Sequence, residues 1–160
     1  MRQPVQELFE DYQNNLYAAA FNVCKNAEDA KDVVQDTFIQ YYSLKKDFDS
    51  EQHIRAWLFR VAINRAKNMN RTFWRRNKKS LEDYMETLVF ETPESEELFE
   101  TVMKLPEKYR IVIHLFYYED YNVNEIADIL KISQSNVKAR LSRGRSLLKE
   151  RLQEEWNDDE

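Results

Sequence analysis

The sequence of 160 residues is poor in the residue types that make turns and cross-links, with one glycine, one cysteine and three prolines. Sheet folds usually need glycine-rich turns, so this scarcity favours an all-α protein. Because Cys24 is the only cysteine, an intramolecular disulfide and a cysteine metal cluster are excluded, which suits a reducing cytoplasm. No apolar run approaches the ~20 residues of a membrane span and no signal segment begins the chain, so we expect a cytoplasmic location.

Residues typical of catalytic and metal sites are also scarce. The two histidines, His53 and His114, have no cysteine or carboxylate at metal-ligand spacing. The sequence also has no glycine-rich phosphate loop and no nucleophile–base signature. We therefore expect no catalytic residue, no metal, no cofactor and no small-molecule substrate, and we interpret His114 as a packing residue.

The net charge of -5 is distributed in blocks. Residues 54–79 contain nine basic side chains and no acidic one, and residues 131–152 carry a net charge of +6, whereas the rest of the chain is acidic. Two basic islands in an acidic chain indicate two separate contacts with a polyanion.

Helical spacing of apolar residues predicts three helices in the first half of the chain. They cover residues 5–23, a segment capped by Asn26, and residues 54–76, with a loop over 45–52. The expected inner face of the third helix consists of its larger apolar residues and two alanines: Ile54, Trp57, Leu58, Val61, Ala62, Ala66, Met69 and Phe73. These helices predict an N-terminal domain, residues 1–76, built as a bundle of three to four helices.

A linker over residues 77–95 is predicted, because the periodicity is lost there and Pro93 disfavours helix in the residue before it. The linker is acidic. A C-terminal domain, residues 96–160, should then contain four helices. In its second helix, residues 107–119, five apolar or aromatic residues are expected inside: Tyr109, Val112, Ile113, Phe116 and Tyr117.

The spacing of residues 122–148 is typical of a helix-turn-helix. Val123–Leu130 forms a short helix that Asn122 and Glu125 can cap, Lys131–Ile132 forms the turn, and a longer helix opens at Ser133. The polar and basic residues predicted to face outward are Ser135, Asn136, Lys138, Arg140, Ser142, Arg143 and Arg145. This face suits a DNA groove, although an ordinary helical hairpin with a solvated basic face has the same pattern.

Two other faces carry polar residues. On the helix from Ile54, nine cations are predicted to share a face with three asparagines, Phe73 and Trp74, which favours unpaired nucleic acid over a merely solvated face. For Trp57 alone a core position is the better interpretation. On the second helix, four polar residues recur on one side, as either a solvated face or a docking surface for a basic protein: Asp29, Asp32, Gln35 and Asp36.

Three segments together resemble the signature segments of extracytoplasmic-function sigma factors, the smallest sigma-70-type members: DAKDVVQDTFIQYY, IRAWLFRVAINRAKN and LPEKYRIVIHLFYYEDYNVNEIADILKISQSNVKARLSRGRSLLKERL. The resemblance is collinear from about Leu8 to Leu152. It implies two helical domains, regions two and four, joined by a linker and without catalysis of their own. In the resembled family the linker threads polymerase channels that otherwise hold nucleic acid, so the acidic linker is expected either to mimic a phosphate backbone or to be a merely solvated tether. It also implies core RNA polymerase and promoter DNA as partners, with an anti-sigma factor as a further expected partner.

The resemblance implies roles for individual residues. The polymerase-clamp contact corresponds to Asp29, Asp32, Gln35 and Asp36, and residues 45–52 correspond to the loop that receives a flipped base of the minus-ten element. The promoter-melting residues correspond to Asn64, Arg65, Lys67 and Asn68. The minus-thirty-five contact corresponds to Ser135, Asn136, Lys138, Ala139, Arg140, Ser142, Arg143 and Arg145.

Within the minus-thirty-five helix we expect Lys138 or Arg140 to read bases, and Arg143 and Arg145 to grip phosphates. Ala139 and Ser142 are small, which leaves the sequence preference open. Family members usually have glycine where this chain has Lys131. A positive φ would cost a lysine about 1 kcal/mol, so an adjusted turn is expected.

A competing hypothesis from another class is a two-domain helical regulator that binds DNA without polymerase. The acidic face of the second helix and the melting helix are the features that separate the two hypotheses, and both favour a sigma factor.

Overall fold

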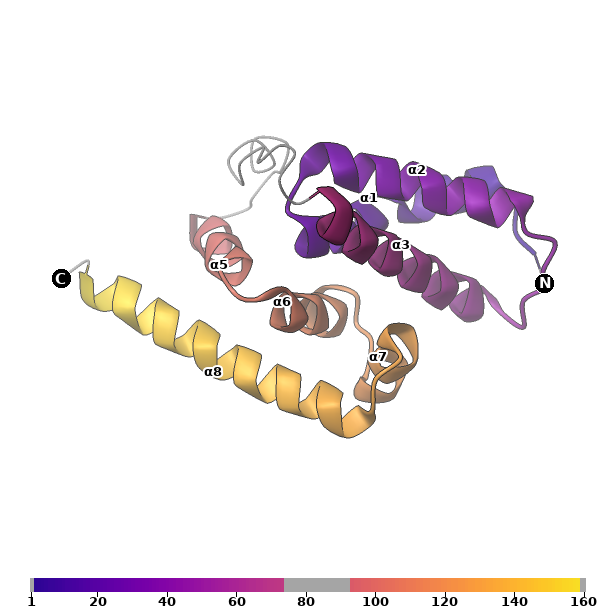
Figure 1. Cartoon of the computed structure of the whole chain (residues 1–160). Coiled ribbons are helices and arrows are strands. Elements are labelled where there is room, and N and C mark those ends of the chain that lie inside the picture. The colour runs from indigo at the N-terminus through magenta and orange to yellow at the C-terminus, as the bar shows by residue number, and fades with distance from the viewer. Residues whose placement is uncertain (1, 74–92, 159–160) are drawn as a thin grey trace. The chain divides into compact units, whose positions relative to one another are not determined.

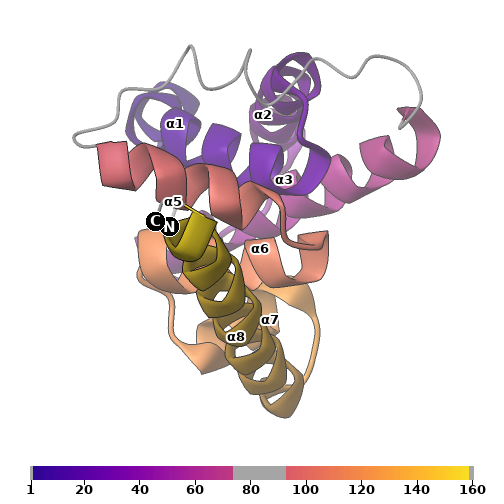
Figure 2. The ribbon, with the colours of Figure 1, turned by 90° about the vertical axis from the view of Figure 1, so that its left-hand side faces the viewer.

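The computed structural model describes residues 2–73 and 93–158, and all regular elements of these residues are helices (Figures 1 and 2). The chain divides into two compact units, Met1–Tyr84 and Met85–Glu160. Each unit has its own set of buried apolar side chains. The predicted all-α fold with two helical domains is confirmed, and most of the predicted acidic linker lies outside the described residues.

The first unit contains α1 (Val5–Cys24), α2 (Ala27–Ser43) and α3 (Glu51–Phe73) (Figure 1). The predicted cap of α2 is confirmed, because the Asn26 side chain accepts a hydrogen bond of 2.9 Å from the backbone N–H of Asp29. The apolar stripe of α2 is buried throughout: Ala30, Val33, Val34, Phe38 and Tyr41.

The third helix begins at Glu51, three residues before its predicted start. Ser50 caps it, since the Ser50 Oγ accepts a hydrogen bond of 3.1 Å from the backbone N–H of His53. The predicted loop is correspondingly shorter and ends at Ser50.

The predicted inner face of α3 was partly wrong. Trp57, Val61 and Met69 are only half-buried, whereas Phe59 and Ile63 are fully buried and were not predicted. The buried residues follow the i, i+4 row that starts at Ile54 and extend to one side of it, while Trp57 and Val61 flank the row on the other side. Among residues 51–69, for which the structure describes the side chains, the buried residues of α3 are Ile54, Leu58, Phe59, Ala62, Ile63 and Ala66. The predicted inner residue Phe73 lies outside this range.

The second unit contains α5 (Pro93–Met103), α6 (Glu107–Ile113), the π-helical turn η1 (His114–Tyr118), α7 (Val123–Leu130) and α8 (Gln134–Asp158). The helix that starts at Pro93 follows the proline rule applied to the sequence. Gly144 serves a close approach of helices rather than a turn. A Cβ at this position would lie 3.0 Å from Ile113 Cδ1 and 3.4 Å from Tyr109 Cβ, so glycine lets α8 approach α6.

The π-helical turn η1 changes the orientation of the side chains that follow α6. Tyr117, predicted to lie inside, is 52% exposed, while Leu115, which was not predicted, is buried. Ile111, which lies in α6 before the turn, is also buried and was also not predicted. The backbone N–H of Glu119 donates to the carbonyl of His114 at 3.2 Å, an i to i+5 bond that widens the helix by one residue. The 3.6-residue period therefore no longer gives the inward face beyond Ile113.

His114 is a buried packing residue, as predicted. Its Nε2 lies 2.9 Å from Oε2 of Glu119, which is also buried, and its ring stacks on Tyr118 with centroids 5.5 Å apart. This pair lies inside the unit that carries the helix-turn-helix. A polar side chain that loses its partner in such a place costs the fold the desolvation of the remaining group.

Replacing this carboxylate, Glu119→Ala, is expected to destabilise the second unit by about 1–3 kcal/mol, because it removes the buried contact between the carboxylate and His114 Nε2. Thermal unfolding followed by circular dichroism measures the change. Glu150→Ala, at an exposed position of α8, is the matched control and should leave the melting temperature unchanged. Equal melting curves for the two variants would contradict the assignment.

Candidate nucleic-acid and protein-binding surfaces

The helix-turn-helix has the predicted local geometry. Asn122 Oδ1 accepts from the Glu125 N–H at 2.8 Å, and Glu125 Oε1 accepts from the Asn122 N–H at 2.9 Å, so the predicted capping box begins α7. At the start of α8, the Ser133 Oγ accepts from the Asn136 N–H at 3.0 Å. Ile126 and Val137 are buried on the two helices and Ala127 is nearly so.

The expectation of an adjusted turn was wrong, because Lys131 itself adopts the left-handed conformation, with φ 58° and ψ 45°. The N–H groups of Lys131 and Ile132 both donate to the carbonyl of Ala127, the latter at 3.1 Å. These bonds close the helix end and require a positive φ at the residue between helix and turn. The Lys131 side chain is exposed, so the conformation costs backbone strain without a steric clash in the core.

Relief of this strain should be measurable. Lys131→Gly is expected to stabilise the second unit by up to about 1 kcal/mol, because glycine adopts a positive φ without the Cβ penalty. Lys131→Ala removes the same charge but keeps the Cβ, and should bring no such gain. Chemical denaturation of both variants tests the idea, and a gain of equal size in both would attribute the effect to charge.

Most of the predicted minus-thirty-five residues form one exposed face at the start of α8. The fully exposed members are Ser135, Asn136, Lys138, Ala139, Ser142 and Arg143. Arg140 is half-buried at the edge of this face, and its Nε donates to Asn136 Oδ1 at 3.1 Å. Val137, Leu141 and Gly144 are buried on the opposite side and fix which way the face points.

Arg145 lies apart from this cluster, two turns beyond Lys138. Its Nε donates to the Tyr117 hydroxyl at 2.6 Å, and its guanidinium lies 5.4 and 5.5 Å from the ring centroids of Phe116 and Tyr117. Such stacking on aromatic faces holds a guanidinium at the surface in a defined orientation. Tyr117, an exposed residue of η1, thus holds the Arg145 guanidinium in place.

The four polar residues predicted on α2 do not all face the solvent equally. Asp32 and Gln35 are exposed on the side opposite the core, Asp29 is half-buried, and Asp36 turns toward α3. Two apolar side chains that the sequence analysis missed continue the exposed row, seven residues after Asp32 and Gln35. These are Ile39, 62% exposed, and Tyr42, 72% exposed. The signal in the sequence was that both fall outside the buried stripe: Ile39 directly follows Phe38, and Tyr42 directly follows Tyr41.

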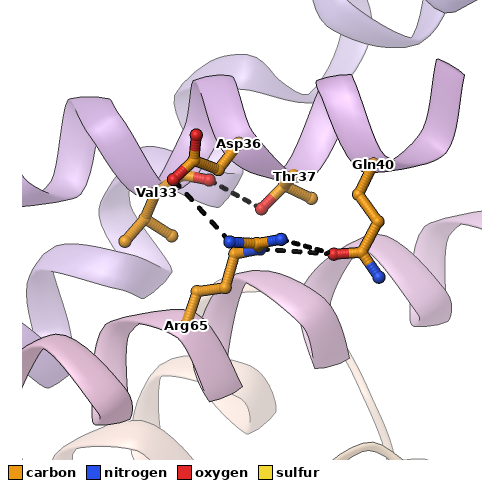
Figure 3. Close-up of polar contacts among 5 residues, drawn as sticks. All are labelled: Val33, Asp36, Thr37, Gln40 and Arg65. Carbon is orange, nitrogen blue, oxygen red and sulfur yellow. Dashed lines mark hydrogen bonds and ion pairs between the residues drawn. The ribbon is translucent and has the colours of Figure 1, made fainter. Parts of the chain in front are cut away.

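The predicted melting residues are divided between two sides of α3. Asn64 and Asn68 are exposed and Lys67 is half-buried, but Arg65 points to α2. Its Nε and Nη2 donate to Gln40 Oε1 at 3.3 and 2.8 Å, and its Nη1 lies 3.7 Å from Asp36 Oδ2 (Figure 3). The hypothesis that all nine cations share one face was therefore wrong for Arg65. Trp74 and the cations beyond it lie outside the described residues.

The loop between α2 and α3 is built on an aromatic cluster. Phe48 is buried, and its ring centroid lies 5.8 Å from that of Tyr41, 6.0 Å from Trp57 and 5.1 Å from His53. Arg2 holds the same region from the start of the chain. Its guanidinium lies 4.5 Å from the Tyr41 ring centroid and donates to the carbonyls of Tyr41 at 2.7 Å and Lys46 at 3.3 Å. The predicted base-receiving loop is thus fixed at both ends.

The second unit also has an apolar hollow of about 570 Å³ between α5, the α6–η1 segment and α8. Its apolar lining includes Leu98, Val102, Ile113, Leu148 and Leu152, and Arg145 and Lys149 add positive charge. In the described part of the chain, no group of three or more histidine, cysteine or acidic side chains could hold a metal ion. None of the helices described here combines the length and the apolar character that crossing a membrane requires.

Comparison with known proteins gives the family. The model of Sigma-70 region 2 matches residues 8–80, and that of Sigma-70, region 4 matches residues 95–148. The ECF RNA polymerase sigma factor SigW of Bacillus subtilis is 30% identical, with 93% of this chain and 91% of that protein aligned.

Two solved structures share the fold. CnrH, in complex with the cytosolic domain of CnrY, is 29% identical with a TM-score of 0.69 and covers 93% of this chain and 87% of its own. The sigma factor RpoE from Bartonella quintana, in complex with the anti-sigma factor NepR, has a TM-score of 0.69 at 20% identity, covering 92% and 96%. The resemblance found in the sequence is confirmed, and the chain belongs to the extracytoplasmic-function sigma factors of the sigma-70 family, which are non-enzymatic transcription initiation factors.

Proposed function

We propose that this sigma factor distributes promoter-directed initiation over three surfaces: the outer side of α2 for core RNA polymerase, α3 with its preceding loop for the minus-ten element, and the start of α8 for the minus-thirty-five element. The observation that carries the proposal is the separation of two DNA-suited faces into two units while the acidic side of α2 remains exposed. The chain supplies recognition, and the polymerase supplies the chemistry.

The α2 surface suits a protein partner better than DNA. The carboxylate of Asp32 would repel phosphates, while Ile39 and Tyr42 offer exposed apolar area that water-facing helices usually avoid. A mixture of exposed acid, amide and apolar groups along one helix row is expected to bind a basic and partly apolar surface. The proposed polymerase contact is therefore Asp32, Gln35, Ile39 and Tyr42, with Asp29 and Asp36 at its edge.

The α3 surface suits an unpaired strand. The exposed amides of Asn64 and Asn68 can donate to and accept from base edges, and Lys67 can follow the phosphates. The aromatic cluster around Phe48 gives the neighbouring loop a rigid base on which a flipped nucleotide can be held. Ser135, Asn136, Lys138, Arg140 and Arg143 form the corresponding contact with duplex DNA in the second unit.

An anti-sigma factor is proposed as the regulator of the chain. Of the two solved relatives, one was captured with an anti-sigma factor and the other with the cytosolic domain of a second protein. The apolar hollow of the second unit supports the proposal, because it offers a protein partner a largely apolar surface next to the positive charge of Lys149. The chain is proposed to act in the cytoplasm and to have no catalytic activity of its own.

Transcription in vitro tests the function directly. Core RNA polymerase should produce specific transcripts from fragments of the source genome when this protein is added, and none of those transcripts without it. Substituting the proposed DNA-contacting cations of α8, Lys138, Arg140 and Arg143, with alanine should abolish these transcripts, while the variant should still bind core RNA polymerase. If the protein binds the fragments but never redirects the polymerase, the proposed function is wrong.

A further inference from the structure

Arg65 is held by α2, and one residue provides most of the hold. Gln40 Oε1 accepts from both Arg65 Nε, at 3.3 Å, and Arg65 Nη2, at 2.8 Å (Figure 3). The Asp36 carboxylate is farther away, 3.7 Å from Nη1, and Asp36 and Arg65 are 51% and 40% exposed in their side chains. An ion pair so exposed and so long contributes little to stability, so the hydrogen bonds to Gln40 are the main contact between Arg65 and α2.

The geometry fixes the plane of the guanidinium. Two donors on one edge of a planar group share a single acceptor, so the plane cannot rotate about its long axis without losing one of the bonds. A guanidinium has five N–H groups, and Gln40 accepts from only two of its nitrogens. The Nη1 group makes no hydrogen bond to Gln40, and the Asp36 carboxylate at 3.7 Å is beyond hydrogen-bond distance, so the Nη1 N–H groups can still donate to an anion that approaches from outside α2 and α3.

The acceptor is itself well placed. Gln40 is half-buried, one turn after the buried Thr37, whose Oγ1 donates to the Val33 carbonyl at 2.7 Å (Figure 3). The helix that carries Gln40 is thus anchored in the core of the unit directly beside the contact. Gln40 is neutral, so its hydrogen bonds orient Arg65 without adding to the negative charge that the partly exposed Asp36 carboxylate already places 3.7 Å from Nη1.

We propose that Gln40 is a positioning residue for promoter melting: it presents Arg65 to the phosphates of the separated minus-ten strand, next to the exposed amides of Asn64 and Asn68. The inference rests on the proposed function of α3 and adds to it a residue of α2 that the family resemblance did not supply. Pre-orientation matters here because a guanidinium that must search for its phosphate loses conformational entropy on binding.

The test uses the holoenzyme at saturating core RNA polymerase, on a promoter found by the transcription assay. Permanganate reactivity of unpaired thymines measures the fraction of open complex. Gln40→Leu, which keeps the size but removes the acceptor, is expected to lower this fraction about fivefold, the factor that corresponds to one poorly aligned charge-assisted hydrogen bond. Affinity for core enzyme and the melting temperature should stay unchanged.

The same substitution at Gln6, an exposed residue of α1, is the matched control and should have no effect. The decisive comparison is made with Arg65→Gln. If Gln40 acts through Arg65, Gln40→Leu causes no further loss in the Arg65→Gln background.

An equal loss in both backgrounds, or a lowered melting temperature that accounts for it, would overturn the positioning role and leave the DNA role of Arg65 intact. If Arg65→Gln itself leaves the open complex unchanged, the proposed role of Arg65 in melting is wrong, and the role of Gln40 falls with it.

Discussion

Asp32→Lys is expected to lower the affinity of the chain for core RNA polymerase tenfold or more, without changing its helix content or melting temperature. Asp32 is exposed on the side of α2 opposite the buried stripe, so the folded unit tolerates either charge there. A basic partner, by contrast, would meet a like charge inside the interface. Reversed charges at protein interfaces cost about 1.4 kcal/mol or more, which is a factor of ten in affinity.

The structure decides which acidic residue makes a clean test. Asp36→Lys would place a cation beside Arg65, which now lies 3.7 Å from the Asp36 carboxylate, so it would disturb the α2–α3 contact as well as any interface. Glu10→Lys on α1 is a better control, because it changes the net charge equally at an exposed position outside the proposed surfaces. Fluorescence anisotropy with labelled protein measures the affinities, and equal losses for Asp32→Lys and Glu10→Lys would assign the effect to net charge alone.

The helices and their ends could be predicted because their causes are local. Asn26, the Asn122–Glu125 pair and Pro93 each act within one turn of the helix they begin, and the structure has all three where the sequence placed them. The burial pattern failed in part of the regular helix α3, where the buried side extends to Phe59 and Ile63, and again where the chain departs from the 3.6-residue period. The π-helical turn at His114 displaces the side chains after Ile113. The residue types of this segment give no sequence signal that predicts a π-helical turn.

The candidate surfaces could be predicted less completely than the helices and their ends. Periodicity shows which side of a helix is polar, but it does not show what a long side chain binds across an interhelical contact. Arg65 was expected to face DNA with the other cations, and its bonds to Gln40 depend on how α2 and α3 pack. Ile39 and Tyr42 were not predicted, because single apolar residues on the polar outer face of a helix have no evident role in the sequence. The structure places both in one exposed row with Asp32.

The start of α8 should separate base reading from phosphate binding. Arg140→Ala is expected to lower transcription from a minus-thirty-five promoter tenfold or more and to relax the sequence preference there, because a bidentate arginine–guanine contact discriminates by about 1–3 kcal/mol. The structure adds a reason for this choice: Arg140 Nε donates to Asn136 Oδ1, which orients the guanidinium toward the N-terminal end of the helix, the end that usually enters the major groove. Lys138, exposed one turn after Gln134, is the alternative base reader.

Arg143→Ala should behave differently. Arg143 is exposed about one turn after Ala139. Loss of a phosphate contact there would lower the affinity for all DNA sequences alike and reduce the slope of the salt dependence by about one unit.

Arg145 is held by the Tyr117 hydroxyl, so Tyr117→Phe should reproduce part of any effect of Arg145→Ala, and it should do so without altering the sequence preference. Binding-site selection and salt titration on each variant measure the two properties separately. If Lys138→Ala, Arg140→Ala, Arg143→Ala and Arg145→Ala all keep the original preference, this helix is an electrostatic anchor, and the base-reading residues lie elsewhere in the chain.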